Sequence, residues 1–263
     1  MKQIFSSGGG TQSTAIAVLI IQGRLPKPDL VVIADTGREC SETWQYLNEI
    51  VKPALMSVGI GVNLVGHEWS SQPKHGKDYL SHNRNTLLLG AWTNQTGKPG
   101  KLPGFCSARW KVDAIDRYLS HKFSLTKRNI KKWIGFSLDE WRRSQRIMAG
   151  KEGQKGLIRL PLVRDVPLTR QQAIQEVEKM GWPLPPRSRC WMCPNQTDDE
   201  WLDLKLNHSK EFEKAIDFEK EMQLFDPLCW LHKSCIPLNM VNFSIEPTLF
   251  DTGQYCDTGI CFV

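Results

Sequence analysis

The first residues with a clear chemical use form a glycine-rich segment near the start of the chain. Gly8, Gly9 and Gly10 stand between a weakly alternating stretch, residues 3–6, and an apolar run that begins at Ala15. Glycines let the backbone approach an anion, and unpaired N–H groups at a helix start point toward it. Hydroxyl donors are added by Ser7, Thr11 and Ser13. The segment therefore predicts a phosphate-binding loop, and the alternative is a tight glycine turn without a ligand.

Two well-known phosphate-binding patterns are absent from this loop. The Gly-Lys-Ser/Thr ending of a Walker A motif is missing, and so is the third glycine of the dinucleotide fingerprint. The loop therefore matches neither motif, and its ligand has to be inferred from other segments of the sequence.

Cysteines form the second group of residues with chemical potential. The chain has eight, and Cys190 and Cys193 are three positions apart and followed by Pro194. Two thiolates at this spacing can reach one metal ion from a tight turn. The chain starts without an apolar secretory signal, which predicts a cytoplasmic protein whose cysteines are thiols or ligands rather than disulfides. Three others are expected to be buried as small hydrophobic side chains: Cys40, Cys229 and Cys235.

Strands and helices that would position these residues alternate along the first part of the chain. Residues 30–34 are a continuous apolar, β-branched run, which predicts a strand buried on both faces. A helix is expected after the glycine loop, another from Ser41 or Glu42, and a third strand at residues 62–65. This alternation predicts right-handed crossovers and a parallel sheet. Ligands of such sheets bind outside the carboxyl ends of the strands, so residues 6–14 and 35–43 should face one crevice.

The rest of the chain is less regular. Residues 66–104 are rich in Gly, Pro, Asn, His and Lys and predict a long, partly irregular insertion, followed by a helix at residues 111–119 and a strand at residues 132–136. Thr169 and Thr197 begin capping-box patterns that start helices. We therefore expect an α/β domain at residues 1–150 and a helical, cysteine-bearing region at residues 151–263.

Composition narrows the range of partners. The net charge of +6 fits a polyanion such as nucleic acid or a phosphorylated nucleotide, although many proteins carry as much. No apolar run approaches the ~20 residues that cross a bilayer, so no membrane partner is expected.

The segment after the second predicted strand carries a family resemblance. It reads Ala34-Asp35-Thr36-Gly37-Arg38-Glu39, followed by Thr43-Trp44-Gln45-Tyr46-Leu47. This resembles the Asp-Thr-Gly-x-Glu…Thr…Tyr-Leu segment of the phosphoadenosine phosphosulfate (PAPS) reductases and related ATP pyrophosphatases. Three further segments resemble motifs of that family in the same order: Phe105–Lys111, Ile134–Arg143 and Arg187–Pro194. The similarity covers nearly the whole chain.

This resemblance implies a fold and a set of site residues. The fold would be a doubly wound, mostly parallel sheet of the adenine nucleotide alpha hydrolase type, with a helical, cysteine-bearing C-terminal extension. The glycine loop would hold the pyrophosphate of ATP. Nucleotide-binding residues would be Ser7, Gly8, Gly9, Gly10, Thr11, Gln12, Ser13, Asp35, Thr36, Gly37, Glu39 and Gly135. Catalytic residues would be Ser13, Asp35, Arg109, Lys111 and Arg143.

Each of these groups has a physical role in that scheme. Asp35 and Thr36 could orient ribose or adenine, and Asp35 could instead hold Mg²⁺ with phosphate oxygens. Arg109, Lys111 and Arg143 would neutralise phosphate charge in the transition state. The alternative for each basic residue is a solvated surface charge.

Two departures from the family pattern are present. The common loop reads Ser-Gly-Gly-x-Asp-Ser, and here Gln12 stands where the acid is usual. The Glu-Cys-Gly-Leu/Ile-His tail of sulfonucleotide reductases is absent from the last residues, Gln254–Val263. The first departure places the chain in a divergent subgroup, and the second argues against a simple PAPS reductase.

The resemblance also extends the proposed metal site. Cys106 would be a third ligand, and Cys256 or Cys261 a fourth, because similar family members often finish with a cysteine pair. Four thiolates suit a [4Fe–4S] cluster or a tetrahedral Zn²⁺. The resemblance favours the cluster, since cluster-bearing relatives share this fold.

These observations lead to one leading function and two alternatives. The leading function is adenylation of a substrate by ATP, coupled to sulfur transfer, with an adenine nucleotide, nucleic acid and a cysteine desulfurase or other sulfur donor as partners. The first alternative is reduction of an adenylyl sulfate. The second is a nucleotide-binding subunit without turnover in a larger assembly, which Gln12 supports.

Overall fold

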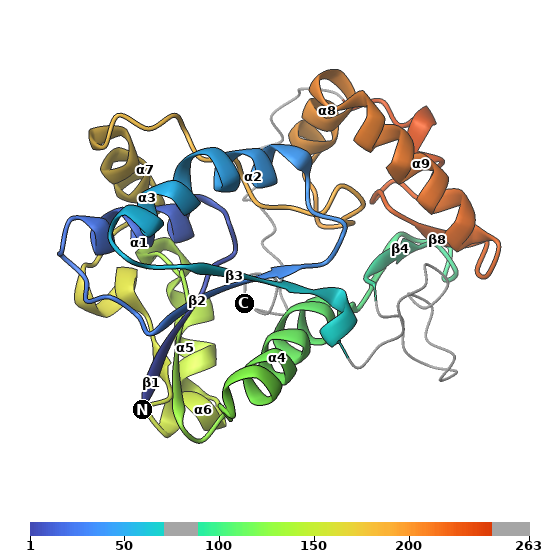
Figure 1. Ribbon diagram of the computed structural model, residues 1–263. Coiled ribbons are helices and arrows are strands. Elements are labelled where there is room, and N and C mark those ends of the chain that lie inside the picture. The colour runs from blue at the N-terminus through green and yellow to red at the C-terminus, as the bar shows by residue number, and fades with distance from the viewer. Residues whose placement is uncertain (71–88, 244–263) are drawn as a thin grey trace. The chain divides into compact units, whose positions relative to one another are not determined.

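The computed structural model describes residues 1–70 and 89–243, and the chain divides into two compact units. Among the described residues, the first unit contains 1–70 and 110–188, and the second contains 89–109 and 189–243. Figure 1 labels the elements of both units. The chain leaves the first unit and later returns to it, so one boundary in the sequence cannot separate the two.

A five-stranded parallel sheet forms the centre of the first unit. Its order is β3 (Val62–Gly66), β2 (Leu30–Asp35), β1 (Lys2–Ser6), β6 (Ile130–Trp133) and β7 (Ile158–Arg159). All four neighbouring pairs run parallel. The chain passes from β1 to β2 and β3 on one side, then continues to β6 on the other side of β1. Strand order therefore reverses beside β1, where doubly wound sheets bind ligands.

Helices cover both faces of this sheet, and its strands are apolar on both faces. Phe5, Val31 and Ile33 belong to one buried cluster, whereas Ile4 and Val32 belong to another. The first cluster lies under α1 (Thr11–Ile21), α2 (Ser41–Tyr46), α3 (Lys52–Ser57) and α7 (Arg170–Lys179), and the second under α4 (Asp113–Phe123). Figure 1 shows these helices on opposite sides of the strands.

A third buried cluster completes the first unit at the edge near β7. It contains Ile134, Phe136, Ile158 and Leu160. Here α5 (Trp141–Ala149) and α6 (Lys151–Gln154) follow a 3₁₀ turn at Leu138–Glu140. π-helical residues lie at Leu47–Val51, at Ser107–Val112 and at Pro161–Asp165, and a second 3₁₀ turn lies at His67–Trp69.

The second unit contains a small antiparallel sheet and a helix pair. The sheet has the order β5 (Gly100–Leu102), β4 (Ala91–Thr93) and β8 (Cys229–Trp230). The helices are α8 (Asp198–Asn207) and α9 (Ser209–Gln223), followed by a 3₁₀ turn at Leu238–Met240. Trp201, Phe212 and Phe218 are buried among their helices.

Most of the predicted elements are confirmed, with three differences. The strand expected at residues 132–136 is β6 at Ile130–Trp133, because Ile134 and Phe136 turn into the third cluster instead. Residues 66–104, expected to be partly irregular, contain two short strands that the sequence pattern did not predict, β4 and β5. The boundary expected at residue 150 differs from the observed division, because β7 pairs with β6 and α7 packs on α1. The capping boxes at Thr169 and Thr197 are both present.

Among the described residues, no helix is both long enough and apolar enough to span a membrane.

Candidate functional site

The glycine loop connects the end of β1 to the start of α1 and is held by its own side chains. The Gly8 N–H donates to Ser13 Oγ at 2.9 Å, and the Gly9 N–H donates to Ser7 Oγ at 3.3 Å. Gly10 is the N-cap of α1 and has an extended conformation. The first N–H groups of a helix have no intrahelical acceptor, so those of α1 are directed at the space beyond the loop. Such a helix start favours an anion.

Glycine is required at two positions of this loop for steric reasons. Gly9 has a φ of +77°, and a Cβ there would lie 3.0 Å from Thr43 Cγ2. A Cβ on Gly10 would lie 3.3 Å from the backbone nitrogen of Ser188. Neighbouring segments therefore approach the loop too closely for a side chain.

The loop after β2 is folded by its own polar side chains. Asp35 Oδ1 accepts a hydrogen bond from the Gly37 N–H at 2.7 Å, and Thr36 Oγ1 accepts one from the Arg38 N–H at 3.3 Å. The Arg38 guanidinium lies 4.8 Å from the centroid of the Trp110 ring. Because β1 and β2 are parallel neighbours, this loop and the glycine loop lie at the same edge of the sheet.

Both loops line one narrow cleft, as expected from the parallel sheet. Its lining residues are Ser7, Gly8, Gly9, Ile33, Ala34, Glu39, Thr43, Trp44, Leu47 and Lys111. Lys111 is the one cation among these residues, and its Nζ lies 3.9 Å from Glu39 Oε2. The side chains of Lys111 and Glu39 are only 12% and 7% exposed, so water screens their charges little. The Ser188 hydroxyl donates to Glu39 Oε1 at 2.8 Å.

A buried carboxylate, Glu140, connects the glycine loop to α5. Gln12 Nε2 donates to Glu140 Oε2 at 3.2 Å, and Glu140 Oε1 forms an ion pair with Arg143. The Arg143 guanidinium also lies 4.6 Å from the centroid of the Phe136 ring. Gly135 is close as well, since a Cβ there would lie 3.4 Å from Ser13 Oγ. The structure therefore places Gly135 and Arg143 near the loop, with the Arg143 charge balanced by Glu140.

Glu140 and Ser188 are absent from the predicted site residues, although both lie in segments that carry the family resemblance. A signal for Glu140 exists, because Ser137 and Glu140 have capping-box spacing and the structure forms that box. Ser188 is the serine of the Arg187–Pro194 segment that carries the resemblance, but its approach to Gly10 depends on the path of a segment distant in sequence.

The predicted metal ligands that are described lie in the second unit. Residues 190–196 form a tight turn in which the Cys193 N–H donates to the Cys190 carbonyl at 3.0 Å. The side chain of Gln196 donates to the Trp191 carbonyl at 3.2 Å, which holds the turn closed. Burial raises the pKa of the Cys193 thiol to about 11, and the neighbouring Cys106 adds to this rise. Cys106 is thus near enough to Cys193 to act on it electrostatically, but among the described residues these three thiols do not form a group whose sulfurs all lie within 4.8 Å of one another.

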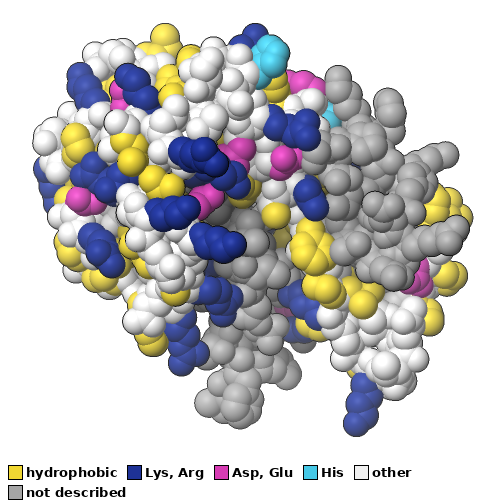
Figure 2. Space-filling view, turned by 90° about the horizontal axis from the view of Figure 1, so that it is seen from below, with side chains coloured by type: hydrophobic (Ala, Val, Ile, Leu, Met, Phe, Trp, Pro, Cys, Tyr) yellow, Lys and Arg dark blue, Asp and Glu magenta, His cyan; other side chains and the backbone are white. Residues whose placement is uncertain are grey.

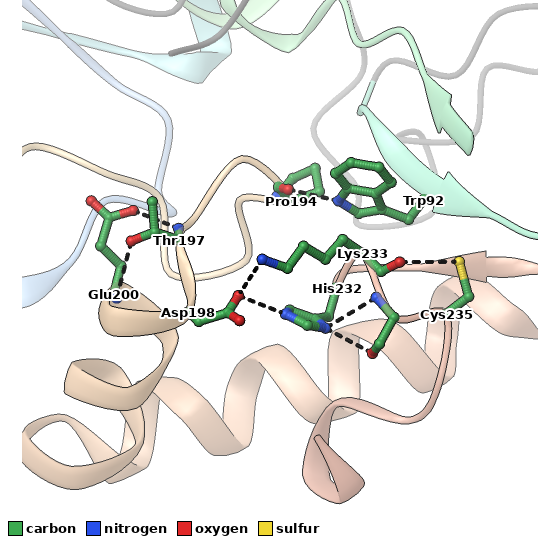
Figure 3. Close-up of polar contacts among 9 residues, drawn as sticks. Trp92, Pro194, Thr197, Asp198, Glu200, His232, Lys233 and Cys235 are labelled. Carbon is green, nitrogen blue, oxygen red and sulfur yellow. Dashed lines mark hydrogen bonds and ion pairs between the residues drawn. The ribbon is translucent and has the colours of Figure 1, made fainter. Parts of the chain in front are cut away.

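The antiparallel sheet supports this turn from below. Trp92 on β4 donates from its indole N–H to the Pro194 carbonyl at 2.9 Å, as Figure 3 shows. A Cβ on Gly90 would lie 3.6 Å from Pro194 Cγ, so β4 approaches the turn closely.

Other predicted residues fall outside these groups. Cys256 and Cys261 lie outside the described residues. Arg109 belongs to the second unit, and the glycine loop to the first. Three cysteines are buried as expected: Cys40, Cys229 and Cys235.

A polar group around His232, which the sequence did not indicate, joins α8 to the segment after β8. His232 Nε2 lies 3.1 Å from Asp198 Oδ1, and Nδ1 lies 2.7 Å from Ser234 Oγ (Figure 3). The Ser234 N–H donates to Nδ1, so this nitrogen is the acceptor and Nε2 carries the proton toward Asp198. Burial lowers the pKa of His232, although Asp198 acts in the opposite direction. The group therefore holds a neutral imidazole inside the second unit.

Comparison of the chain with protein-family models, curated proteins and solved structures gave no match.

Proposed function

We propose that this protein binds ATP at the glycine loop and transfers its adenylyl group to a substrate, as PP-loop ATP pyrophosphatases of the PAPS reductase family do. The observation that carries the proposal is the position of the Ser7–Ser13 loop, where strand order reverses and α1 begins. Glu39 and Lys111 line the cleft beside this loop, and the rest of the Asp35–Glu39 loop lies at the same edge of the sheet. The site therefore offers the N–H groups at the start of α1, the loop hydroxyls and the mostly buried ammonium of Lys111, which together suit a polyphosphate.

The residues of the cleft divide the chemistry between them. A substrate oxygen attacks the α-phosphorus of ATP, the bond from that phosphorus to the bridging oxygen breaks, and pyrophosphate leaves. N–H groups of the loop and the Lys111 ammonium take up the charge that develops on the leaving pyrophosphate. A sulfur or nitrogen nucleophile then displaces AMP from the adenylated substrate. Mg²⁺, for which Asp35 offers a carboxylate, would add charge neutralisation at the phosphates.

Cysteine thiols of the second unit fit a metal group of the thiolate type. Cys190 and Cys193 extend from one turn, and Cys106 lies close enough to affect the Cys193 thiol. A [4Fe–4S] cluster or Zn²⁺ would be held by these three residues, with Cys256 or Cys261 as a further ligand. The cluster would supply or accept sulfur or electrons, whereas zinc would hold the turn in place.

An activity measurement tests the adenylation proposal. The full chain is incubated with Mg²⁺ and ATP labelled in the α-phosphate, with oligonucleotide acceptors and a sulfide donor, and AMP and pyrophosphate are measured. Lys111→Ala should lower product formation at least tenfold, since a buried charge partner of the phosphates is lost. Lys210→Ala, an exposed lysine on α9, is the matched control and should retain activity. Failure of the wild-type chain to bind MgATP at millimolar concentration contradicts the proposal.

One observation favours the alternative of a nucleotide-binding subunit without turnover. Gln12 replaces the usual acid, and the nearby carboxylate of Glu140 is already paired with Arg143. Binding of MgATP without formation of AMP or pyrophosphate, with every acceptor tried, would support this alternative over catalysis.

The metal proposal is tested by anaerobic purification and elemental analysis. About four irons and four sulfides per chain indicate a cluster, and one zinc per chain indicates a structural site. Cys190→Ser and Cys193→Ser should each remove the metal, whereas Cys229→Ala, another buried thiol, should retain it. Wild-type protein with neither metal contradicts the proposal.

A further inference from the structure

The C-terminal half of α4 and the connection to β6 form a strongly basic segment. Residues 117–132 contain no Asp or Glu, and their basic residues are Arg117, Lys122, Lys127, Arg128, Lys131 and Lys132. All of them belong to the first unit. This is the densest run of like charge in the chain, and no role assigned to the cleft uses it.

Three of these charges are balanced by neighbouring acids. Lys132 is buried and donates to Asp116 at 2.6 Å, and Lys127 Nζ lies 3.1 Å from Asp116 and 3.5 Å from Glu152. Attraction by Asp116 raises the pKa of Lys127. Arg117 Nε lies 3.4 Å from Asp113. These three residues serve mainly to fix the ends of α4 and β6.

The remaining three charges are available to a partner. Lys122 and Arg128 are exposed and Lys131 is half-buried, and none of them has an ion pair within the part of the chain that the structure describes. Figure 2, a view from below Figure 1, shows dark blue Lys and Arg side chains gathered on this face, with magenta acidic side chains among them.

Aromatic rings lie directly beside these cations. Phe123 is 41% exposed, and its ring meets Tyr118 edge to face at 5.8 Å between centroids. Tyr118 in turn meets Trp69 edge to face at 5.4 Å and donates from its hydroxyl to Asn63. Lys122 Nζ lies 5.9 Å from the Trp69 ring centroid. Phe123 is therefore a partly exposed ring that is held in place by its packing on Tyr118 and, through Tyr118, on Trp69. We name the set Trp69, Tyr118, Lys122, Phe123, Arg128 and Lys131 the α4 surface.

The cations of the α4 surface that lead into β6 lie away from the nucleotide cleft. The connection from α4 enters β6 at Ile130, which pairs with Lys2 at the start of β1, whereas the glycine loop follows the end of β1. Arg128 and Lys131 thus lie at the strand ends opposite the glycine loop, whereas Trp69 follows the carboxyl end of β3. Five residues of β1 at ~3.3 Å each separate the two ends of that strand by about 15 Å.

Exposed cations with an adjacent exposed ring suit single-stranded nucleic acid. Lysine and arginine bind phosphates, and an aromatic ring stacks on an unpaired base. A membrane surface fits less well, because the apolar face of α4 is already buried in the core through Ala114, Ile115 and Leu119. We infer that the α4 surface binds the backbone and bases of single-stranded nucleic acid. Binding of nucleic acid at this surface does not depend on the proposed function. Only the further step, that this polymer is the substrate adenylated in the cleft, rests on that function.

Fluorescence anisotropy of a labelled 20-nucleotide oligo(dT) with the full chain tests this inference without ATP. The triple variant Lys122→Gln, Arg128→Gln, Lys131→Gln should lower affinity at least tenfold at low salt. It should also reduce the slope of log K against log salt by about 2, since each lost phosphate contact removes ~0.7 for single strands. Phe123→Ala should lower affinity about tenfold through lost stacking, with little change in the salt slope.

A matched control removes the same charge elsewhere. The triple variant Lys210→Gln, Lys214→Gln, Lys220→Gln changes three exposed lysines of α9 and should retain both affinity and slope. Equal losses in the two triple variants would show non-specific attraction by net charge and overturn the inference. Binding to vesicles containing phosphatidylserine but not to oligo(dT) would overturn it in favour of a lipid surface. MgATP binding by the α4-surface variant, measured separately, distinguishes failure here from failure of the proposed function.

Discussion

At Gly9, both the backbone conformation and the proposed nucleotide site require a residue without a side chain. Its φ of +77° is in the left-handed region, and a Cβ would lie 3.0 Å from Thr43 Cγ2. Gly9→Ala should therefore lower the free energy of unfolding by about 1–2 kcal/mol and weaken MgATP binding about tenfold or more. Gly23→Ala is the matched control, because Gly23 has a φ of +72° with nothing within 4 Å and lies beyond α1. Urea unfolding and calorimetric titration of both variants check this. Equal MgATP affinity in the two variants would remove Gly9 from the site.

Gln12 shows how a departure from a family pattern can be explained by a neighbour. Its amide donates to Glu140, which is itself buried and paired with Arg143. Gln12→Asp would put a second carboxylate beside Glu140 and should destabilise the fold by about 1–3 kcal/mol. Gln12→Asn, of the same size without the charge, should cost about 1 kcal/mol or less. If urea denaturation gives the same stability for both variants, the Glu140 carboxylate does not face position 12 in solution.

At the scale of elements, His232 connects α8 to the segment after β8 and makes the second unit sensitive to acid. Burial lowers its pKa below the ordinary 6.5, so the unfolded chain takes up the proton first as pH falls. Stability from the neutral imidazole is complete above pH 6.5 and is lost as pH falls from there through the folded pKa. Urea midpoints at pH 7.5 and 5.5 should therefore differ more for the wild-type chain than for His232→Asn. Identical pH dependence in the two would contradict this role.

Asp198, the partner of His232, affects the stability of the fold only in a separate, lower pH range. Burial alone would raise its pKa, but hydrogen bonds from His232 and Lys233 outweigh burial and hold the pKa below 3.8. Its contribution to stability is present above that value and is lost only below it. The loss between pH 7.5 and 5.5 thus reports His232 rather than its carboxylate partner.

Elements with a strong local pattern could be predicted from the sequence, and those that depend on distant contacts could not. The run Leu30–Ala34 is apolar throughout because β2 is covered on both faces, and the pattern alone predicts it. β4 and β5 have three residues each; among the described strands β5 pairs only with β4, and β4 gains its other partner from β8, more than 120 positions further along. Likewise the glycine loop could be predicted as an anion site, whereas Glu140 and Ser188 reach it only through tertiary folding.

At the scale of the whole molecule, the two units should respond differently to loss of a thiolate-bound metal. The contacts that shape the glycine loop, through Thr43, Ser188 and Glu140, all lie within the first unit. The thiols of Cys106 and Cys193 instead connect the end of the β4–β5 hairpin to the turn before α8. Removing the metal should free that turn, because structural metal binding contributes directly to folding free energy.

Hydrogen exchange with and without a chelator measures this difference. Amides of residues 190–196 and of β4 should exchange at least tenfold faster after chelation, whereas those of β1, β2 and α1 should be unchanged. MgATP affinity, measured on the same samples, should remain within about twofold, because the hydrogen bonds that hold the loop, from Gly8 to Ser13 and from Gly9 to Ser7, lie within the first unit. Uniform loss of protection in both units would show that the metal stabilises the whole chain. No change in either unit would show that the three thiols bind no structural metal.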